Sequence, residues 1–279
     1  MQLLGVVTDE QYERYLAAGL TGFLFPLADF SCDYVKTYTL SQIKAFRVNF
    51  PTAHCFVVMN KMLFQADLSS LLSTLKSLEE MNVTGILFYD TAILYTVKKE
   101  QLKLPLYLYQ THFVTNTKTV QTYHSLGVTG AYISNEITLD EIKAIANQTN
   151  AFLMMLLVGY PVVAMSRRHL LTNYQKMIGS TYQNALTVEE PFSKQKYRLY
   201  ESKEGTTFRY GKRLNNSIAY KPLENKIAYG ILEQADFTSE MYEALIRAYH
   251  TFDQKKIDAI AGHNRGFLYR KTIYRVKKK

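Results

Sequence analysis

Several polar side chains that could carry acid–base or hydrogen-bonding chemistry follow short apolar runs in this sequence. If these runs are buried strands, each polar group lies at a strand's carboxyl end, where α/β barrels collect their functional residues. Acids, amides and one arginine at such a place could bind a small polar molecule, the arginine holding a carboxylate in bidentate fashion. The candidates for this ligand pocket are Asn60, Asp90, Gln110, Asn116, Glu136, Ser166, Arg168 and Glu233.

Some of these residues also have a simpler interpretation as helix caps. Asp90, Asn116 and Glu136 each precede a predicted helix, where a side-chain oxygen commonly accepts a backbone N–H. The neighbouring His112 is interpreted as a loop histidine rather than a ligand. The sequence contains no HExxH, no GxSxG and no phosphate-binding glycine loop, so it indicates neither a metal-activated water nor an activated serine. It therefore identifies no catalytic residue.

A second chemical signal is the mixture of positive charge and aromatic rings late in the chain. Of the net charge of +9, residues 191–221 contribute +6 and residues 265–279 contribute +7, which leaves −4 for the rest. Cations contact phosphates and aromatic faces stack on unpaired bases, so this mixture favours single-stranded RNA, although a solvated hairpin would give the same pattern. The RNA-binding candidates are Lys196, Tyr197, Arg198, Tyr200, Arg209, Tyr210, Lys212 and Arg213.

The elements that must position these residues follow from the apolar pattern. Short, nearly continuous apolar runs alternate with segments of helical spacing, as in parallel strands buried on both faces. The clearest helix spans residues 67–81, and Thr138 with Glu141 forms a capping box before another. An eighth strand is expected at 227–232, with a helix from residue 239 to about 252 after it. The first seven predicted strands are Leu3–Val7, Gly22–Leu27, His54–Met59, Gly85–Tyr89, Pro105–Tyr109, Gly130–Ser134 and Phe152–Val158.

This alternation predicts an α/β fold, a TIM-like (βα) barrel, as a single domain over residues 1–279. Residues 175–222 interrupt it as a basic, Tyr-rich excursion before the last strand, expected to form a β-hairpin, and residues 266–279 form a basic C-terminal tail. A doubly wound open sheet is the alternative, but no GxGxxG follows the first strand.

Cysteine usage and hydropathy indicate a cytoplasmic protein. Cys32 and Cys55 are the only cysteines and form no CxxC pair, so one chain cannot build a cysteine metal site. The most apolar stretch, residues 151–165, is too short for a membrane helix and is interrupted by Gly159 and Pro161, so we expect a buried strand and no membrane association. The N-terminus lacks the basic region of a signal peptide.

Several segments, in order along the chain, resemble the collagenase-like peptidase family, peptidase family U32. GYPVVAMSRRHLLTNY resembles the family signature, which reads roughly His-Gly-x-x-Cys-x-x-Tyr-Ser-Gly-Arg-Cys-x-x-Ser. In this chain Val158 stands at the position of the histidine, and Val162 and His169 stand at those of the two cysteines. GILEQ keeps Glu233 of a later motif but loses its arginine. The segments that carry the resemblance are 60–94, 110–142, 159–174, 230–250 and 263–269.

The resemblance implies a role in RNA modification. The family includes proteins that use prephenate to hydroxylate tRNA uridine or rRNA cytidine, and these bind an iron–sulfur cluster through their cysteines. A chain without those thiolates is expected to bind no cofactor alone, to take prephenate as a ligand at most, and to leave the cluster to a cysteine-bearing paralogue. Its expected partners are that paralogue and tRNA. Collagenase-like peptidase activity and a noncatalytic barrel with a ligand pocket are the alternatives, so whether the chain is itself an enzyme stays open.

Overall fold

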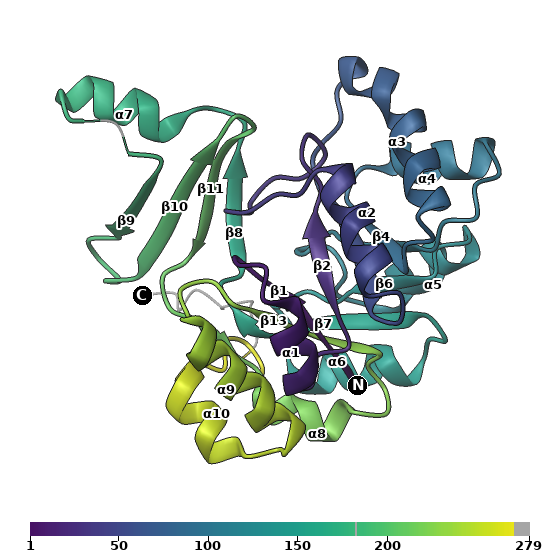
Figure 1. The fold of residues 1–279 in the computed structure, drawn as a ribbon. Helices are drawn as coiled ribbons and strands as arrows, with labels where there is room; N and C mark the ends of the chain where they lie inside the picture. The colour runs from purple at the N-terminus through teal and green to yellow at the C-terminus, as the bar shows by residue number, and fades with distance from the viewer. Residues whose placement is uncertain (182, 271–279) are drawn as a thin grey trace.

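The apolar runs of the sequence form a closed barrel of eight parallel strands in the computed structural model, which describes residues 1–181 and 183–270 (Figure 1). The strands pair in chain order, and the barrel closes because β7 pairs with both β6 and β13 while β13 pairs with β1. The predicted TIM-like barrel is therefore confirmed, and the open sheet is wrong. The barrel strands are β1 (Gln2–Val6), β2 (Gly22–Pro26), β3 (His54–Met59), β4 (Gly85–Phe88), β5 (Leu106–Leu108), β6 (Gly130–Tyr132), β7 (Phe152–Gly159) and β13 (Tyr229–Glu233).

Helices cover the outside of the barrel, and several begin at the caps that the sequence contains. Thr138 and Glu141 form the predicted capping box of α6, whereas Asp67 does not cap α3 with its side chain. Its carboxylate instead accepts the N–H of Phe64 at 2.8 Å, at the start of a short 3-10 helix, η1 (Gln65–Asp67). The helices of the barrel are α1 (Tyr12–Ala18), α2 (Leu40–Asn49), α3 (Leu68–Glu80), α4 (Thr91–Lys99), α5 (Thr117–Ser125), α6 (Leu139–Asn147), η2 (Ser217–Ala219), α8 (Tyr220–Leu223), α9 (Ser239–His250) and α10 (Gln254–Ala261).

The apolar core has two layers, one between the helices and the strands and one inside the barrel. In the outer layer, α3 buries Leu71, Leu75 and Leu78, and each such leucine contributes about 1.5–3 kcal/mol to folding. Inside the barrel, Phe56 meets Tyr107 and Tyr229 edge to face, with ring centroids 5.2 and 5.0 Å apart. This interior filling makes the barrel a solid scaffold for the loops at its carboxyl end.

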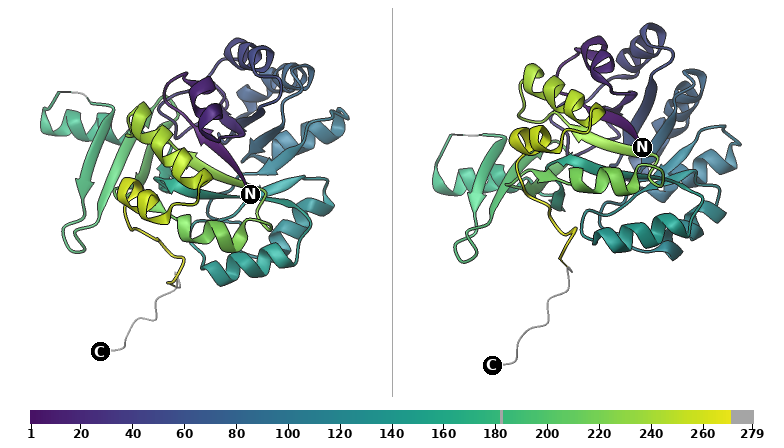
Figure 2. Two further views of the ribbon diagram at one scale, coloured as in Figure 1. Left: turned by 60° about the horizontal axis from the view of Figure 1, so that its bottom comes forward. Right: turned by 90° about the horizontal axis from the view of Figure 1, so that it is seen from below.

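The excursion begins earlier and is larger than the hairpin expected at 175–222. It is a four-stranded antiparallel sheet in the order β8-β11-β10-β9, with α7 (Leu170–Ile178) between β8 and β9. We call these elements the excursion sheet; it stands at one side of the barrel (Figures 1 and 2). The predicted strand Phe152–Val158 matches β7, but the apolar residues after Tyr160 and Pro161 form β8, which belongs to the other sheet. The other strands are β8 (Val162–Ser166), β9 (Ala185–Glu189), β10 (Lys196–Ser202) and β11 (Gly205–Tyr210).

The chain returns to the barrel beside the point where it left. β12 (Leu214–Asn215) pairs antiparallel with the end of β7, so that Leu214 lies opposite Gly159 and Asn215 opposite Val158. Of the basic tail predicted at 266–279, residues 271–279 lie outside the described residues. Within residues 1–181 and 183–270, every helix is too short or too polar to span a bilayer.

Candidate functional site

Two adjoining cavities lie where the carboxyl ends of the barrel strands face the excursion sheet. The inner cavity, of about 220 Å³, lies between strand-end tyrosines and β8. The outer cavity, of about 770 Å³, lies between the loop after β6, the end of β11 and the turn after α10. Thr111, His112 and Val162 line both cavities, and we call these three residues the neck.

Tyrosines form one wall of the inner cavity. The hydroxyls of Tyr34 and Tyr109 are 3.0 Å apart and share a hydrogen bond. Burial raises the pKa of both phenols well above its usual value, so they stay neutral and cannot act as bases near pH 7. The cavity therefore offers aromatic faces together with neutral hydroxyls that donate and accept hydrogen bonds.

A buried ion pair connects the excursion sheet to the barrel at this point. Arg209 of β11 donates through Nη1 to the carbonyl of Tyr160 at 3.0 Å and lies 3.4 Å from the carboxylate of Glu233 at the end of β13. Burial acts to lower the pKa of Arg209, but Glu233 and Asp33 outweigh this effect and raise it. Among the predicted RNA-binding residues, Arg209 lies inside the barrel mouth, where it lines the inner cavity.

Glu233 is held tightly from the other side as well. One of its oxygens accepts the backbone N–H of Tyr160 at 2.9 Å. A Cβ atom at Gly159 would lie 2.5 Å from the same carboxylate oxygen, so a side chain at that position would displace the carboxylate. The predicted pocket residue Glu233 thus lies at the mouth, but it is committed to Arg209 and the β7 backbone.

Positive charge gathers around the outer cavity. Lys212, Arg213 and Arg270 line it together with His263, while Glu136 is the acid among the lining residues of the described chain. The sequence predicted Lys212 and Arg213 as RNA-binding residues, together with Tyr210, which also lines this cavity. Their clustering gives the cavity a net positive charge that would attract an anion.

Two of the predicted RNA-binding arginines share one carboxylate beside this cavity. Arg198 donates to Asp236 at 2.9 Å, Arg213 pairs with its other oxygen, and the hydroxyl of Tyr160 donates to it as well. Arg213 also stacks 3.7 Å from the ring centre of Phe237. Burial acts to raise the pKa of Asp236, but the hydrogen bonds from Arg198, Arg213 and Tyr160 prevail and lower it to about 2. Two cations therefore meet one anion, which leaves a net positive charge.

His112 and Glu136 form a titratable pair at the neck. Nδ1 of His112 lies 3.3 Å from the carboxylate of Glu136. Hydrogen bonding to Glu136 raises the pKa of His112, and the same contact lowers the pKa of Glu136. His112 lies in the loop after β5, as interpreted, and it also lines both cavities.

The remaining strand-end candidates serve mainly to hold loops in place. Asn60 lines the inner cavity, and its Oδ1 accepts the N–H of Cys32 at 3.0 Å. Both oxygens of Asp90 accept backbone N–H groups, from Leu63 and Ala92, at 2.9 Å each. The capping interpretation of Asp90 thus matches its observed contacts.

Other candidates lie away from the two cavities or contact neither. Gln110 donates to the carbonyl of Tyr89 at 3.0 Å, and Asn116 caps α5 by accepting the N–H of Thr119 at 2.9 Å. Ser166 and the exposed Arg168 belong to the excursion sheet, and neither lines the mouth. The sequence predicts that they follow the seventh barrel strand at its carboxyl end, but Ser166 ends β8 and Arg168 comes after it, so a strand of the excursion sheet separates both from β7.

Four of the predicted RNA-binding residues lie on β10, one of them the Arg198 that pairs with Asp236. Lys196 is exposed, and Tyr197 and Tyr200 are partly exposed. The ring of Tyr197 stacks on that of Tyr210 across the strand pair, with centroids 6.3 Å apart. These residues extend the aromatic and cationic surface from the outer cavity along the excursion sheet.

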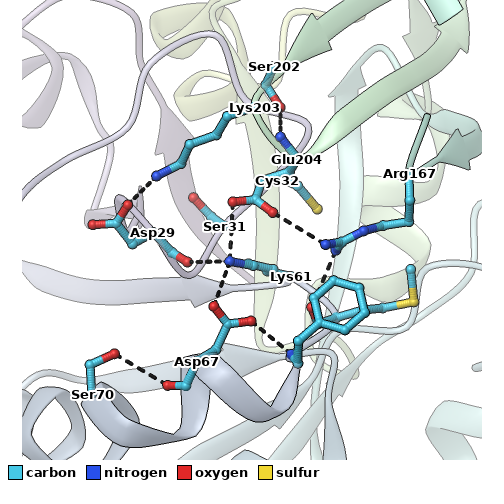
Figure 3. A network of polar contacts seen from close by, with 12 residues as sticks. Asp29, Ser31, Cys32, Lys61, Asp67, Ser70, Arg167, Ser202, Lys203 and Glu204 are labelled. Atoms are coloured by element: carbon cyan, nitrogen blue, oxygen red, sulfur yellow. Dashed lines mark hydrogen bonds and ion pairs between the residues drawn. The ribbon is translucent and has the colours of Figure 1, made fainter. Parts of the chain in front are cut away.

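A polar network that the sequence did not reveal holds the other side of the excursion sheet (Figure 3). Nζ of the buried Lys61 lies 3.0 Å from Asp67 and 3.2 Å from Glu204, the latter in the turn between β10 and β11. Arg167 pairs with Glu204 at 3.6 Å and stacks 4.2 Å from the ring centre of Phe64. Burial acts to lower the pKa of Lys61, but Asp67 and Glu204 raise it overall. No local pattern predicts this network, because its members come from distant segments.

The described residues do not fit the iron–sulfur cluster that the resemblance implies. The residues at the signature's histidine and cysteine positions are Val158, Val162 and His169. Val158 is fully buried in β7, Val162 is part of the neck, and His169 is exposed beside Glu201. The thiols of Cys32 and Cys55 are buried and free, and burial raises the pKa of each. Among residues 1–181 and 183–270, no three histidine, cysteine or acidic residues are grouped to hold a metal.

Comparisons with known proteins bear on the resemblance. The model of peptidase family U32 matches residues 40–204. tRNA hydroxylation protein P of Escherichia coli (strain K12) is similar over 120 residues, at 28% identity, covering 43% of this chain. The match spans 26% of that relative, about a quarter of its length. The structure of the U32 peptidase Mk0906 superimposes with a TM-score of 0.51 at 13% identity, covering 84% of this chain and 92% of the other, and so supports the barrel fold.

Proposed function

Because this chain belongs to peptidase family U32, we propose that it is a subunit of RNA modification that presents tRNA for prephenate-dependent hydroxylation of the wobble uridine. In this proposal the iron–sulfur cluster is supplied by a cysteine-bearing partner of the same family. This chain binds and orients the RNA. The similarity of 120 residues to tRNA hydroxylation protein P supports the choice of RNA within the family.

The observation that carries the proposal is the outer cavity, which is cationic although residues outside 191–221 and 265–279 sum to a net charge of −4. Lys212 and Arg270 are exposed at its rim, and Arg213 lies on its wall. Neutralising phosphates with such side chains releases counterions, which makes nucleic-acid binding favourable and sensitive to salt. Tyr210 and Tyr197 beside the cavity supply faces for base stacking.

The alternative, a collagenase-like peptidase, gains no support from the chemistry at the mouth. The thiol of Cys32 is buried and its pKa is raised, so it is protonated and a poor nucleophile. The phenols of Tyr34 and Tyr109 are likewise neutral. The chain's own groups therefore suit binding and positioning rather than hydrolysis.

The proposal is tested in cells by mass spectrometry of tRNA nucleosides. Deleting the gene should remove hydroxylated wobble uridine, and the wild-type gene should restore it. The double variant Lys212→Glu/Arg270→Glu should restore little, because two phosphate-binding cations become anions. The matched control is Lys76→Glu/Lys103→Glu, which changes two exposed lysines away from both cavities and should restore the modification. Unchanged nucleosides in the deletion strain would refute the proposal.

Binding in vitro gives a second measurement. The affinity for tRNA should fall steeply as salt rises, and the slope of log K against log salt should become shallower by about 0.7–0.9 for each phosphate contact removed. Lys212→Ala and Arg270→Ala should each show this change, and Lys76→Ala should not. Binding by the chain with its partner that is insensitive to salt would contradict the RNA role.

A further inference from the structure

The two cavities have opposite chemical characters although they share a neck. The inner cavity is small, is lined by Tyr34, Tyr89 and Tyr109, and is roofed by β8. The outer cavity is larger and cationic. Resting on the proposed RNA function, we propose that they divide one nucleotide between them, the inner cavity taking a base turned out of the strand and the outer cavity taking its phosphates.

The inner cavity suits a single flat ring. Its volume of about 220 Å³ is below the roughly 300–1,000 Å³ of pockets that enclose drug-sized ligands, so it admits a fragment and not a whole nucleotide. Tyr34 and Tyr109 use one hydroxyl proton between them, since one donates to the other. The second proton is available to a carbonyl oxygen on the edge of a pyrimidine.

The outer cavity suits the phosphates. The side chains of Lys212 and Arg270 form no ion pair with any residue in the described part of the chain, so their charges are available to a ligand. Arg213 is shared with Asp236, and Glu136, the acid on this wall, is paired with His112. The free cations therefore outnumber the free anions around this space.

The neck lies where the sugar would pass. Thr111 is in the loop after β5, and His112 follows it with its ring against Glu136. A base can reach the inner cavity only after leaving its stack, which costs a few kcal/mol in RNA or DNA and least in a loop that is already unpaired. This route restricts the RNA to single-stranded loops and ends.

The test narrows the neck and measures whether the affinity for RNA still depends on the base. Thr111→Trp places a bulky side chain between the cavities, and Thr115→Trp is the matched control, because Thr115 is exposed in the same loop and lines neither cavity. The probes are a short RNA stem-loop with the wobble uridine in its loop and the same RNA without that base. Fluorescence anisotropy measures both affinities in moderate salt.

Wild-type protein and Thr115→Trp should bind the intact RNA about tenfold to a hundredfold more tightly than the abasic RNA, the range expected for stacking one base. Thr111→Trp should bind both RNAs with the weaker affinity and keep the salt dependence of the wild type. Lys212→Ala should weaken both RNAs by the same factor and leave their ratio unchanged, which tests the division without altering the neck.

Two outcomes separate this inference from the proposed function. Salt-sensitive but equal binding of the two RNAs by the wild type would overturn the divided site and leave the RNA role standing. Absence of RNA binding, together with saturable calorimetric binding of uridine 5′-monophosphate that Thr111→Trp removes, would refute the RNA role and support the divided site.

Discussion

The barrel and the excursion sheet are held together by different forces. The barrel interior consists of fully buried rings and aliphatic chains, with Phe56 at its centre. The excursion sheet instead buries polar groups such as Glu201 and Thr206, and ion pairs of Lys61, Arg209 and Asp236 fasten it to the barrel. Salt screens the partly exposed pairs of Asp236, but it screens the buried pairs of Lys61 and Arg209 much less. The cavities lie between the two regions, so their shape depends on these ion pairs.

The largest effect should come from the barrel interior. Phe56→Ala removes a fully buried ring that contacts Tyr107 and Tyr229, and should lower the free energy of unfolding by about 3–5 kcal/mol. Urea denaturation monitored by circular dichroism measures the change. Phe192→Ala is the control, because that ring is 96% exposed and should alter stability by less than about 0.5 kcal/mol. A loss below 1 kcal/mol for Phe56→Ala would show that the interior is not the main source of stability.

A smaller and more local effect should follow from the Lys61 network. Lys61→Met leaves Glu204 with Arg167 as its ionic partner. The substitution should lower the free energy of unfolding by about 2 kcal/mol. This is less than the roughly 3–5 kcal/mol for breaking a wholly buried pair, because Asp67 is partly exposed. Hydrogen exchange should speed up in β10 and β11 more than in β3. Lys76→Met, at an exposed lysine, controls for the substitution. Equal acceleration of hydrogen exchange in β3 and in β10 and β11 would show that Lys61 does not stabilise the excursion sheet in particular.

The sequence predicted the barrel better than it predicted these attachments. Continuous apolar runs locate buried strands, and His54–Met59 was placed at its observed bounds because local composition suffices there. The pairing of Arg209 with Glu233 depends on how β11 pairs with β8, which no local pattern encodes. Arg168 was misplaced for a related reason, since the sequence does not show that the segment after Gly159 and Pro161 forms a strand of a second sheet, β8, ahead of Arg168.

A lesser effect is expected at Asp236, because this carboxylate is 43% exposed. Asp236→Asn should lower the free energy of unfolding by less than about 1 kcal/mol, and this decrease should be smaller in high salt. The pKa is lowered from 3.8 to about 2, so the stabilisation is present above pH 3.8 and is lost as the pH falls towards 2. Comparing thermal unfolding of wild type and variant between pH 5 and pH 2 measures this. A difference that grows on acidification would contradict the assigned contacts.

The smallest effect should be the titration of His112. Its pKa is raised from 6.5, so its contribution is present below pH 6.5 and is lost as the pH rises through the raised value. The pKa of Glu136 is lowered from 4.5, so its contribution is lost only as the pH falls through that lowered value. Glu136→Gln should therefore move the pKa of His112 back towards 6.5 in a nuclear magnetic resonance titration, while Asp140→Asn, at an acid on α6, should leave it unchanged. If the pKa of His112 did not change in Glu136→Gln, the contact between the two side chains would be contradicted.

The pairing of β12 with β7 makes the excursion sheet a self-contained cassette. Gly159 and Leu214 lie opposite one another in adjacent strands, so the chain departs and re-enters through neighbouring positions. A short link between these positions would preserve every hydrogen bond between the eight barrel strands, because none of them involves residues 162–213. The same two positions could accept an unrelated insert. Transplanting residues 162–213 onto another barrel of similar geometry would carry with them the lining residues that they supply to both cavities.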